Sequence, residues 1–243
     1  MSERRTKIIA TLGPASHDPQ VIRELVAAGM DAARLNFSHG DHETHRRACA
    51  EVRAAGEAAG RAVAVIQDIQ GPKIRMGRFA GGSLALERDQ TVRLAPGAAE
   101  AAAGTILIDY PELTEDIAAG ETVYLADGQV RLEVTGREAG GLSARVVSGG
   151  TVRDRQGAAF PDSALALSPL TEKDRTDLAF GRTLEVDYVA ASFVSCRRDV
   201  EEVAALSGVP VIAKIERAAA VRNLPEILAA CHAAMVARGD LGV

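Results

Sequence analysis

Short apolar runs alternate with amphipathic segments over the first third of the chain, and this alternation limits the possible folds most strongly. The runs 7–13, 32–38 and 62–69 are rich in Ile, Val, Leu and Ala, as buried strands are. Segments 18–29 and 41–59 lie between them and have helical periodicity. Strands that alternate with helices are typically parallel and covered on both faces. The sequence therefore predicts an α/β fold.

The predicted helices begin and end at residues that favour helix boundaries. Asp18 is a candidate N-cap, Pro19 occupies the first helical position, and Gly29 follows the last turn. Thr171 is followed three residues later by Asp174, which is a variant of the capping box and predicts another helix start.

The pattern changes between residues 76 and 161. Here short segments alternate apolar and polar residues with a period of two, and Gly-rich turns separate them. This is typical of a small all-β domain. We therefore predict a first barrel part over 1–75, an inserted β-rich domain over 76–161, and a continued barrel part over 162–243.

The α/β pattern returns after the insertion. Strands are predicted at 186–193, 210–216 and 233–240, with helices at 171–183, 197–208 and 224–232. With the three strands of the first part, this makes about six parallel strands, whereas a closed TIM (β/α)8 barrel has eight. The expected fold is thus an incomplete TIM barrel with an inserted all-β domain.

Composition limits the partners and the location of the protein. The formal net charge is −5, and both signs of charge are interspersed along the chain. Such a pattern offers no basic surface for nucleic acid and no polybasic membrane patch. The N-terminus leads directly into a strand without the apolar segment of a signal peptide, so we expect a cytoplasmic protein.

Polar and charged residues gather where the predicted strands end. Barrel enzymes place their active sites at the C-terminal ends of the strands. Carboxylates at these ends come from Asp68, Glu216 and Asp240. Cations come from Arg34, Lys73, Arg75, Lys214 and Arg238.

Glu216 and Asp240 follow consecutive strands of the predicted barrel. Two carboxylates that converge there would suit a hard divalent cation, although each could equally form a structural ion pair. Lys214 alternates with Glu216, so both side chains can face the same side of a strand. A lysine there could stabilise a phosphoryl oxygen or an enolate, and a plain ion pair is the simpler interpretation.

Polar side chains also alternate at the end of the second strand. Arg34 could bind phosphate, and Asn36 and Ser38 could join Asp68 in an oxygen cage for a monovalent cation, although an ordinary polar strand end explains them as well. Three histidines follow at three-residue steps, and the favoured interpretation is a solvated first helical turn rather than a metal cluster. These histidines are His39, His42 and His45.

Seven segments of the chain resemble the pyruvate kinase family and occur in the order found in that family. The segments RLNFSHG, AKIE and MVARGDLG carry most of the specificity, and the β-rich insertion after the third strand matches the lid domain of that family. The matching segments are TKIIATLGPAS, AARLNFSHG, QDIQGPKIRMG, LTEKDRTDLAFG, VDYVAASFV, VIAKIER and MVARGDLGV.

The resemblance implies phosphoryl transfer from phosphoenolpyruvate to ADP, which gives pyruvate and ATP in glycolysis. In that reaction positioning and charge neutralisation do most of the catalysis. The resemblance implies that Glu216 and Asp240 bind Mg²⁺ or Mn²⁺ and that Lys214 stabilises the moving phosphoryl group. It also implies that Arg34 and Arg75 contact phosphate oxygens.

The same resemblance implies several binding positions. Asn36, Ser38, Asp68 and the Ile69 carbonyl correspond to a monovalent-cation site. Further substrate contacts correspond to Ala237, Gly239 and Asp240, besides Arg34 and Lys214. Nucleotide contacts correspond to Pro14, His39 and Arg75. The parent protein is expected to be a homotetramer.

One departure from the family pattern predicts a change in ion requirement. Lys73 stands where many members have Glu, and in the family a lysine there goes with independence from potassium. A fixed ammonium can supply the charge that bound K⁺ would supply. Ile69 replaces a threonine, which matters little if only its carbonyl is used. The segment around Arg155 matches the family only loosely.

Family members continue through two more strands and a further domain, so we expect this chain to be the N-terminal part of such an enzyme. Open sheet edges would then leave Ile8, Val236 and Leu241 partly exposed. Two alternatives remain at this point. One is a magnesium-dependent lyase or aldolase barrel that acts on a pyruvate enolate, and the other is a non-catalytic pseudoenzyme that binds the ligands.

Overall fold

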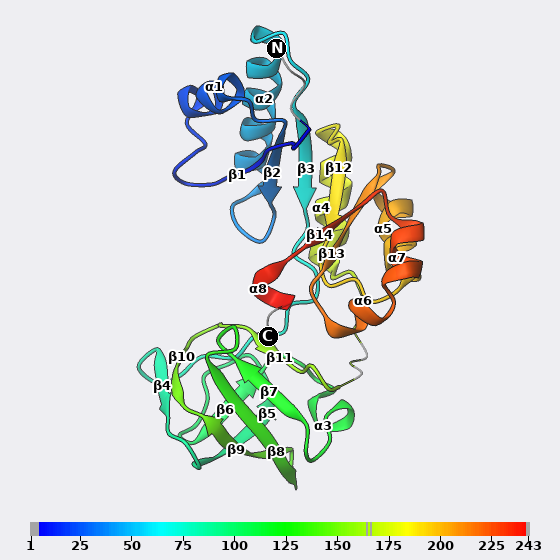
Figure 1. Cartoon of the computed structure of the whole chain (residues 1–243). Helices are drawn as coiled ribbons and strands as arrows, with labels where there is room; N and C mark the ends of the chain where they lie inside the picture. Colours follow the sequence, from blue (N-terminus) through cyan, green and yellow to red (C-terminus); the bar gives the residue numbers. More distant parts are fainter. Residues whose placement is uncertain (1–4, 164, 166, 242–243) are drawn as a thin grey trace. The chain divides into compact units, whose positions relative to one another are not determined.

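The computed structural model describes the chain from residue 5 to residue 241, except for residues 164 and 166. The side chain of Asp240 also lies outside the described part. Within these limits helices alternate with parallel strands, and a β-rich segment interrupts them (Figure 1). The predicted α/β class with an incomplete barrel is therefore confirmed.

Contacts among the described residues divide the chain into two compact units, which are described separately below. The first unit combines the residues up to Pro72 with Pro169–Val236. The second unit combines Lys73–Ser168 with the residues from Ala237 onward. The predicted domain boundaries at residues 75 and 161 stay a prediction.

The first unit is built on one parallel sheet, which contains six strands in the described part of the chain. All neighbouring strands are parallel, and their order in the sheet follows their order in the sequence, as a (β/α) barrel requires. The six predicted strands are thus confirmed. They are β1 (Ile9–Leu12), β2 (Ala32–Asn36), β3 (Ala64–Asp68), β12 (Tyr188–Ala191), β13 (Val211–Ile215) and β14 (Ala233–Val236).

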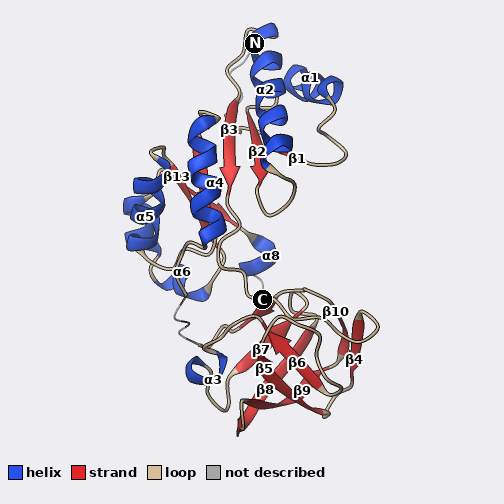
Figure 2. Cartoon of the chain, turned by 180° about the vertical axis from the view of Figure 1, so that it is seen from behind, coloured by secondary structure: helices blue, strands red, loops and turns tan. Residues whose placement is uncertain are grey.

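Helices connect these strands and cover the sheet (Figure 2). Apolar side chains such as Ile22, Val52 and Val200 are buried on their inner faces, which holds them on the strands. The helices of the first unit are α1 (Pro19–Ala28), α2 (His42–Ala58), α4 (Glu172–Thr183), α5 (Arg197–Ser207), α6 (Ala218–Arg222) and α7 (Leu224–Ala230).

The predicted helix boundaries agree with the structure. The Asp18 side chain accepts a hydrogen bond from the backbone N–H of Gln20, and Gly29 ends α1 with a φ of 108°. Thr171 and Asp174 form a complete capping box at the start of α4. These side chains satisfy N–H groups that a helix start leaves without partners.

Two elements differ from the sequence predictions. The last strand was expected to reach Asp240, but β14 ends at Val236 and residues Arg238–Leu241 form the short helix α8. A backbone hydrogen bond of 3.0 Å from Leu241 to Ala237 closes this turn. Helix α6 was not predicted, although its Ala-rich sequence favours a helix.

The second unit contains a six-stranded sheet and a two-stranded sheet in its described residues. Most strand pairs are antiparallel, with β5 and β6 as a parallel pair. Alternate residues such as Leu132 and Val134 point into a continuous apolar core. Its elements are β4 (Ser83–Leu86), β5 (Thr91–Pro96), β6 (Thr105–Ile108), α3 (Leu113–Asp116), β7 (Thr122–Leu125), β8 (Val130–Glu138), β9 (Gly141–Ser148), β10 (Gly150–Arg153) and β11 (Ala158–Ala159).

The two edge strands of the first unit expose apolar side chains. Ile8 is 46% exposed just before β1, and Ile9 is 49% exposed within it. Val236 at the end of β14 is 64% exposed, and Leu241 is partly exposed in α8. The exposure expected for Ile8, Val236 and Leu241 is therefore observed.

Candidate active site

The C-terminal ends of β2, β3 and β13 bring four predicted residues together in the first unit. We call Arg34, Asp68, Lys214 and Glu216 the charge cluster. Asp68 Oδ2 lies 2.5 Å from Arg34 Nε, and Asp68 Oδ1 lies 3.2 Å from Lys214 Nζ. Lys214 Nζ also lies 3.0 Å from Glu216 Oε1. Two cations and two carboxylates thus form one continuous chain of ion pairs.

Burial makes this pairing necessary. Asp68 is 1% exposed, Glu216 is 4% exposed and Lys214 is 9% exposed. A buried charge is costly unless an opposite charge and hydrogen bonds compensate it. The formal charges of the charge cluster sum to zero, so each buried charge has an opposite charge beside it. Loss of one member would leave its partner buried and unpaired. Two positively charged side chains, Arg34 and Lys214, are thereby held at the strand ends.

Two residues of the site were missed in the sequence. Ser192 follows β12 and its hydroxyl lies 2.6 Å from Lys214 Nζ and 2.7 Å from the Ile69 carbonyl oxygen. Phe193 comes next, and its backbone N–H donates a 2.7 Å hydrogen bond to Glu216 Oε2. The available signal was their position, since they end a predicted strand as the recognised site residues do.

The turn at Phe193 has an unusual backbone. Its φ of 56° lies in the left-handed region, which costs free energy for a bulky side chain. Gly71 packs closely against this turn, because a Cβ atom there would lie 2.8 Å from the Ser192 Cβ. The turn directs the Phe193 N–H at Glu216, so a strained residue orients one carboxylate of the charge cluster.

The four predicted ligands of a monovalent cation lie at neighbouring strand ends. Asn36 is paired in register with Asp68 across β2 and β3. Asn36 Oδ1 accepts a 3.1 Å hydrogen bond from the Ser38 N–H, and the Ile69 carbonyl accepts one from Ser192. These are oxygen ligands of the kind that hard cations prefer.

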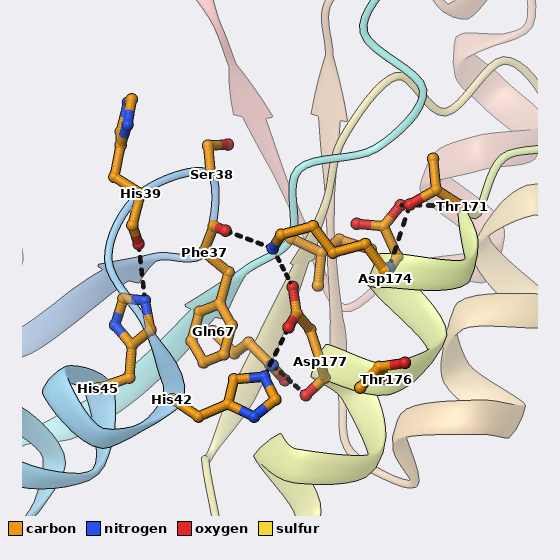
Figure 3. Close-up of polar contacts among 12 residues, drawn as sticks. Phe37, Ser38, His39, His42, His45, Gln67, Thr171, Asp174, Thr176 and Asp177 are labelled. Carbon is orange, nitrogen blue, oxygen red and sulfur yellow. Dashed lines mark hydrogen bonds and ion pairs between the residues drawn. The ribbon is translucent and has the colours of Figure 1, made fainter.

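One of the three histidines after β2 differs from the sequence interpretation (Figure 3). His39 is exposed, but His45 is only 8% exposed and its ring stacks on Phe37 with a centroid distance of 4.0 Å. His42 stacks on Phe180 at 4.0 Å. The expectation of a solvated turn was therefore wrong for His45, which the Phe37 ring covers, whereas the His42 side chain is still 41% exposed beside Phe180.

His45 also forms a polar contact with the loop. Its Nε2 donates to the His39 carbonyl oxygen at 2.9 Å, as a carbonyl can only accept. Burial of the imidazole lowers the pKa of His45, and the bond to His39 opposes this shift in part. Among the described residues, no group of three or more His, Cys, Asp or Glu side chains could hold a metal ion.

A second polar network ties the same loop to α4 (Figure 3). Lys173 Nζ donates to the Phe37 carbonyl oxygen at 2.7 Å and pairs with Asp177 at 2.5 Å. His42 Nε2 lies 2.8 Å from the other oxygen of Asp177. Gln67 is fully buried and donates to the Asp177 carbonyl at 2.6 Å. We call Lys173, Asp177 and His42 the loop clamp.

A cavity of about 520 Å³ lies beside the loop clamp. Phe37, Gly40 and Asp41 line it from the β2–α2 segment, together with the clamp residues, His45 and Thr176. None of the clamp residues was singled out from the sequence as holding this loop. The loop also carries Ser38 and His39, so the clamp fixes the position of two predicted binding residues.

The remaining predicted residues belong to other parts of the chain. Pro14 is exposed in the turn after β1. In the second unit, Arg75 Nη1 donates to the Arg155 carbonyl at 3.1 Å, and Lys73 Nζ lies 3.8 Å from Asp127 Oδ1. Ala237 and Gly239 are also grouped with that unit, and the Asp240 side chain, a predicted metal ligand, lies outside the described residues.

Among the described residues, no helix combines the length and the apolar character that a membrane span requires. This finding applies to both compact units.

Comparison with known proteins assigns the chain to a family. The family described as "Pyruvate kinase, barrel domain" matches residues 3–243. The chain is 47% identical over 245 residues to the pyruvate kinase of Mycobacterium tuberculosis (strain CDC 1551 / Oshkosh), and 48% identical over 245 residues to that of Mycobacterium intracellulare. A pyruvate kinase of Geobacillus stearothermophilus is 39% identical over 249 residues.

These matches cover almost all of the chain but only part of each relative. Each of the three covers 99% of the chain. The chain spans 52% of the two mycobacterial relatives and 42% of the Geobacillus relative. Because the family match extends over nearly every residue, the chain belongs to the pyruvate kinase family.

Proposed function

We propose that the chain carries the phosphoryl-transfer site of a pyruvate kinase, with phosphoenolpyruvate and ADP as substrates and pyruvate and ATP as products. Relatives named pyruvate kinase support this proposal, because their matches cover 99% of the chain. The observation that carries it is Lys214, which is held between Asp68 and Glu216 at the strand ends at 3.2 and 3.0 Å. The family assignment disfavours the lyase or aldolase alternative.

In the proposed reaction the O–P bond of phosphoenolpyruvate breaks and a terminal phosphate oxygen of ADP takes the phosphoryl group. The enolate that remains takes a proton and becomes pyruvate. Lys214 and Arg34 would neutralise charge on the phosphoryl oxygens, because both are cations held in a largely buried cluster. Arg75 would contact phosphate as well, which rests on the resemblance.

We further propose that Glu216 and Asp240 hold Mg²⁺ or Mn²⁺. The donor chemistry of Glu216 fits such an ion, since its carboxylate is oriented at a strand end by the Phe193 N–H. When bound, a divalent ion supplies positive charge that polarises the phosphoryl group. The contribution of Asp240 rests on the resemblance.

The monovalent-cation site, and whether K⁺ is needed there, is a separate proposal. Asn36, Ser38, Asp68 and the Ile69 carbonyl would form the site, and their positions at adjacent ends of β2 and β3 support this. Lys73 would make K⁺ dispensable, by the charge argument given above.

The remaining assignments also stay proposals. Ala237, Gly239 and Asp240 would contact the substrate, while Pro14, His39 and Arg75 would contact the nucleotide. The intact parent protein would be a cytoplasmic homotetramer.

Pyruvate formation from phosphoenolpyruvate and ADP with Mg²⁺, followed with and without K⁺, tests the proposed function. The Lys214→Met variant should lose at least about a hundredfold in kcat, as expected when a donor to transition-state charge is removed. Lys7→Met is the matched control, because Lys7 is exposed before β1, and it should keep full activity. Retained ligand binding without turnover in the wild-type chain would favour the pseudoenzyme alternative, and aldol cleavage would favour the lyase.

A further inference from the structure

The ammonium group of Lys214 has an oxygen partner for each of its three N–H bonds. Glu216 Oε1 lies at 3.0 Å and Asp68 Oδ1 at 3.2 Å, while Ser192 Oγ is the shortest contact at 2.6 Å. A lysine ammonium has three donors and no acceptor. The direction in which this cation points is therefore set by three oxygens, of which two belong to the charge cluster and one to Ser192.

The direction of the Ser192 hydroxyl follows from the same chemistry. Its Oγ lies 2.7 Å from the Ile69 carbonyl oxygen, which can only accept a hydrogen bond. The single hydroxyl proton therefore points to Ile69, and the oxygen lone pairs accept from Lys214. Asp68 Oδ1 at 3.5 Å is a weaker competitor for that proton.

The sheet order explains why Ser192 can reach both partners. Strand β12 lies between β3, which precedes Ile69, and β13, which carries Lys214. Ser192 is 2% exposed, so water does not readily replace its hydroxyl as a partner. The next residue, Phe193, holds Glu216 through its N–H. Two consecutive residues thus contact the lysine, one carboxylate and one carbonyl of the proposed site.

We propose that Ser192 is a positioning residue for the phosphoryl transfer, which sets the direction of the Lys214 ammonium and joins it to the Ile69 carbonyl. This inference rests on the proposed function of the same site. A positioning role differs from a purely structural role, in which the Ser192 hydroxyl would only satisfy the buried carbonyl of Ile69. A structural role predicts lower stability with unchanged chemistry, whereas positioning predicts a slower chemical step.

The proposed effect of Ser192 on the Lys214 ammonium can be tested without measuring turnover. The lysines of the chain are Lys7, Lys73, Lys173 and Lys214, so NMR of the full chain labelled with ¹⁵N at the lysine side chains gives an assignable spectrum. In Ser192→Ala, proton exchange of the Lys214 ammonium with water should become about tenfold faster, the factor expected for a lost hydrogen bond to a charged group. An unchanged Lys214 signal would overturn the inference.

Ser207→Ala is the matched control. Ser207 is 3% exposed, and its hydroxyl lies 3.5 Å from the Ala204 carbonyl in α5 and 3.3 Å from the Val209 carbonyl beyond it. This variant removes a buried serine hydroxyl away from the charge cluster. It should leave the Lys214 signal unchanged and kcat within about twofold of the wild type, which is the range expected for a residue remote from the site.

Kinetics test the functional part. Ser192→Ala should lower kcat by about tenfold to a hundredfold, as small displacements of a catalytic group do, while KM for phosphoenolpyruvate changes much less. Ser192→Cys keeps nearly the same volume, but a thiol is a weak donor and acceptor, so the same loss is expected. Wild-type kcat in the cysteine variant would overturn the proposal, because volume alone would then suffice.

Failure of the proposed function and failure of the inference about Ser192 can be told apart. If the wild-type chain shows no turnover, the proposed function of this chain fails, and the exchange of the Lys214 ammonium still decides what Ser192 does to that group. If the wild type turns over and Ser192→Ala does so equally well, the inference fails and the proposed function stands. Should Ser192→Ala not fold by circular dichroism, Ser192→Cys carries both measurements.

Discussion

Lys173 on α4 donates a 2.7 Å hydrogen bond to the backbone carbonyl of Phe37, at the start of the loop that follows β2. The same ammonium pairs with Asp177, which in turn contacts His42 at the start of α2. The segment from Phe37 to His42 is thereby joined to α4, which is distant in the sequence, through the Lys173–Asp177 pair. The loop clamp holds Ser38 and His39 in place without taking part in the proposed chemistry.

Asp177→Asn should weaken this clamp. The Asp177 side chain is 5% exposed, but its partners are about half exposed, so we expect a loss of about 1–2 kcal/mol in the free energy of unfolding. Urea denaturation measures this loss, and amide exchange in residues 37–40 should become faster. Asp89→Asn is the control, since Asp89 is 68% exposed and its pair with Arg145 lies at the surface. Equal effects of the two variants would contradict the role of the clamp.

Gly181→Ala should destabilise the protein although alanine favours helices. A Cβ atom at this position of α4 would lie 2.0 Å from Gln67 Oε1. Gln67 is fully buried and its amide is bonded to Asp177, so it cannot move freely. Overpacking costs about 1–3 kcal/mol, and a separation of only 2.0 Å places the cost in the upper part of this range, above the helix-propensity gain of about 1 kcal/mol.

Thermal or urea unfolding of a double-mutant cycle checks this prediction. In a Gln67→Ala background, Gly181→Ala should no longer destabilise, because the clashing atoms are gone. Gly13→Ala is the control, since no atom lies within 4 Å of a Cβ there. A Gly181→Ala cost that persists in the double variant would show that something other than Gln67 limits the space.

Stability should decrease in mild acid because of His45. Burial lowers the pKa of His45 below the ordinary histidine value of 6.5, so the unfolded chain binds a proton more readily than the folded chain. The stabilisation by the neutral ring is therefore fully present above pH 6.5 and is lost as the pH falls from there through the folded-state pKa.

Urea midpoints measured between about pH 7.5 and 5 test this sign. His45→Phe keeps a ring against Phe37 and removes the titration, so its stability should vary less with pH than that of the wild type. His17→Phe, at an exposed loop position, is the control and should keep the wild-type slope. An equal slope in the wild type and in His45→Phe would show that another group is responsible.

Lys73→Glu should create a requirement for K⁺ in a chain that turns over phosphoenolpyruvate. The substitution removes the fixed positive charge that we propose in place of the cation. Activity is measured over a K⁺ titration, with Lys7→Glu as the control for a change in net charge. A melting curve is needed as well, because a glutamate would then lie near Asp127. K⁺-independent activity in a folded Lys73→Glu variant would refute the proposal.

The sequence predicts local features of this protein better than contacts between strands. The N-cap at Asp18, the capping box at Thr171 and the alternation of strands and helices depend on neighbouring residues, and the structure contains all of them. The contact between Arg34 and Asp68 depends on which strands are neighbours and on their register, which spacing alone does not specify.

Ser192 illustrates the limit most clearly. A serine after a strand is common, and it becomes informative only when β12 is known to lie between β3 and β13. The chain leaves the sheet after β3 and comes back to it at β12, so this neighbour relation spans the whole insertion. The stacking of His42 on Phe180 was missed for a similar reason, since Phe180 on α4 follows the insertion in the sequence.

Gly71 donates a 3.0 Å hydrogen bond to Asp174 Oδ1, although the two residues are 103 positions apart. The point where the chain departs for the insertion and the point where it comes back are thus fastened together inside the first unit. The entropic cost of closing a loop grows only with the logarithm of its length, so a loop of about a hundred residues costs only about 2 kcal/mol more than one of about ten. Once this fastening forms, the first unit can tolerate inserts of very different size, so the inserted segment can lengthen or shrink in evolution without altering the sheet that bears the charge cluster.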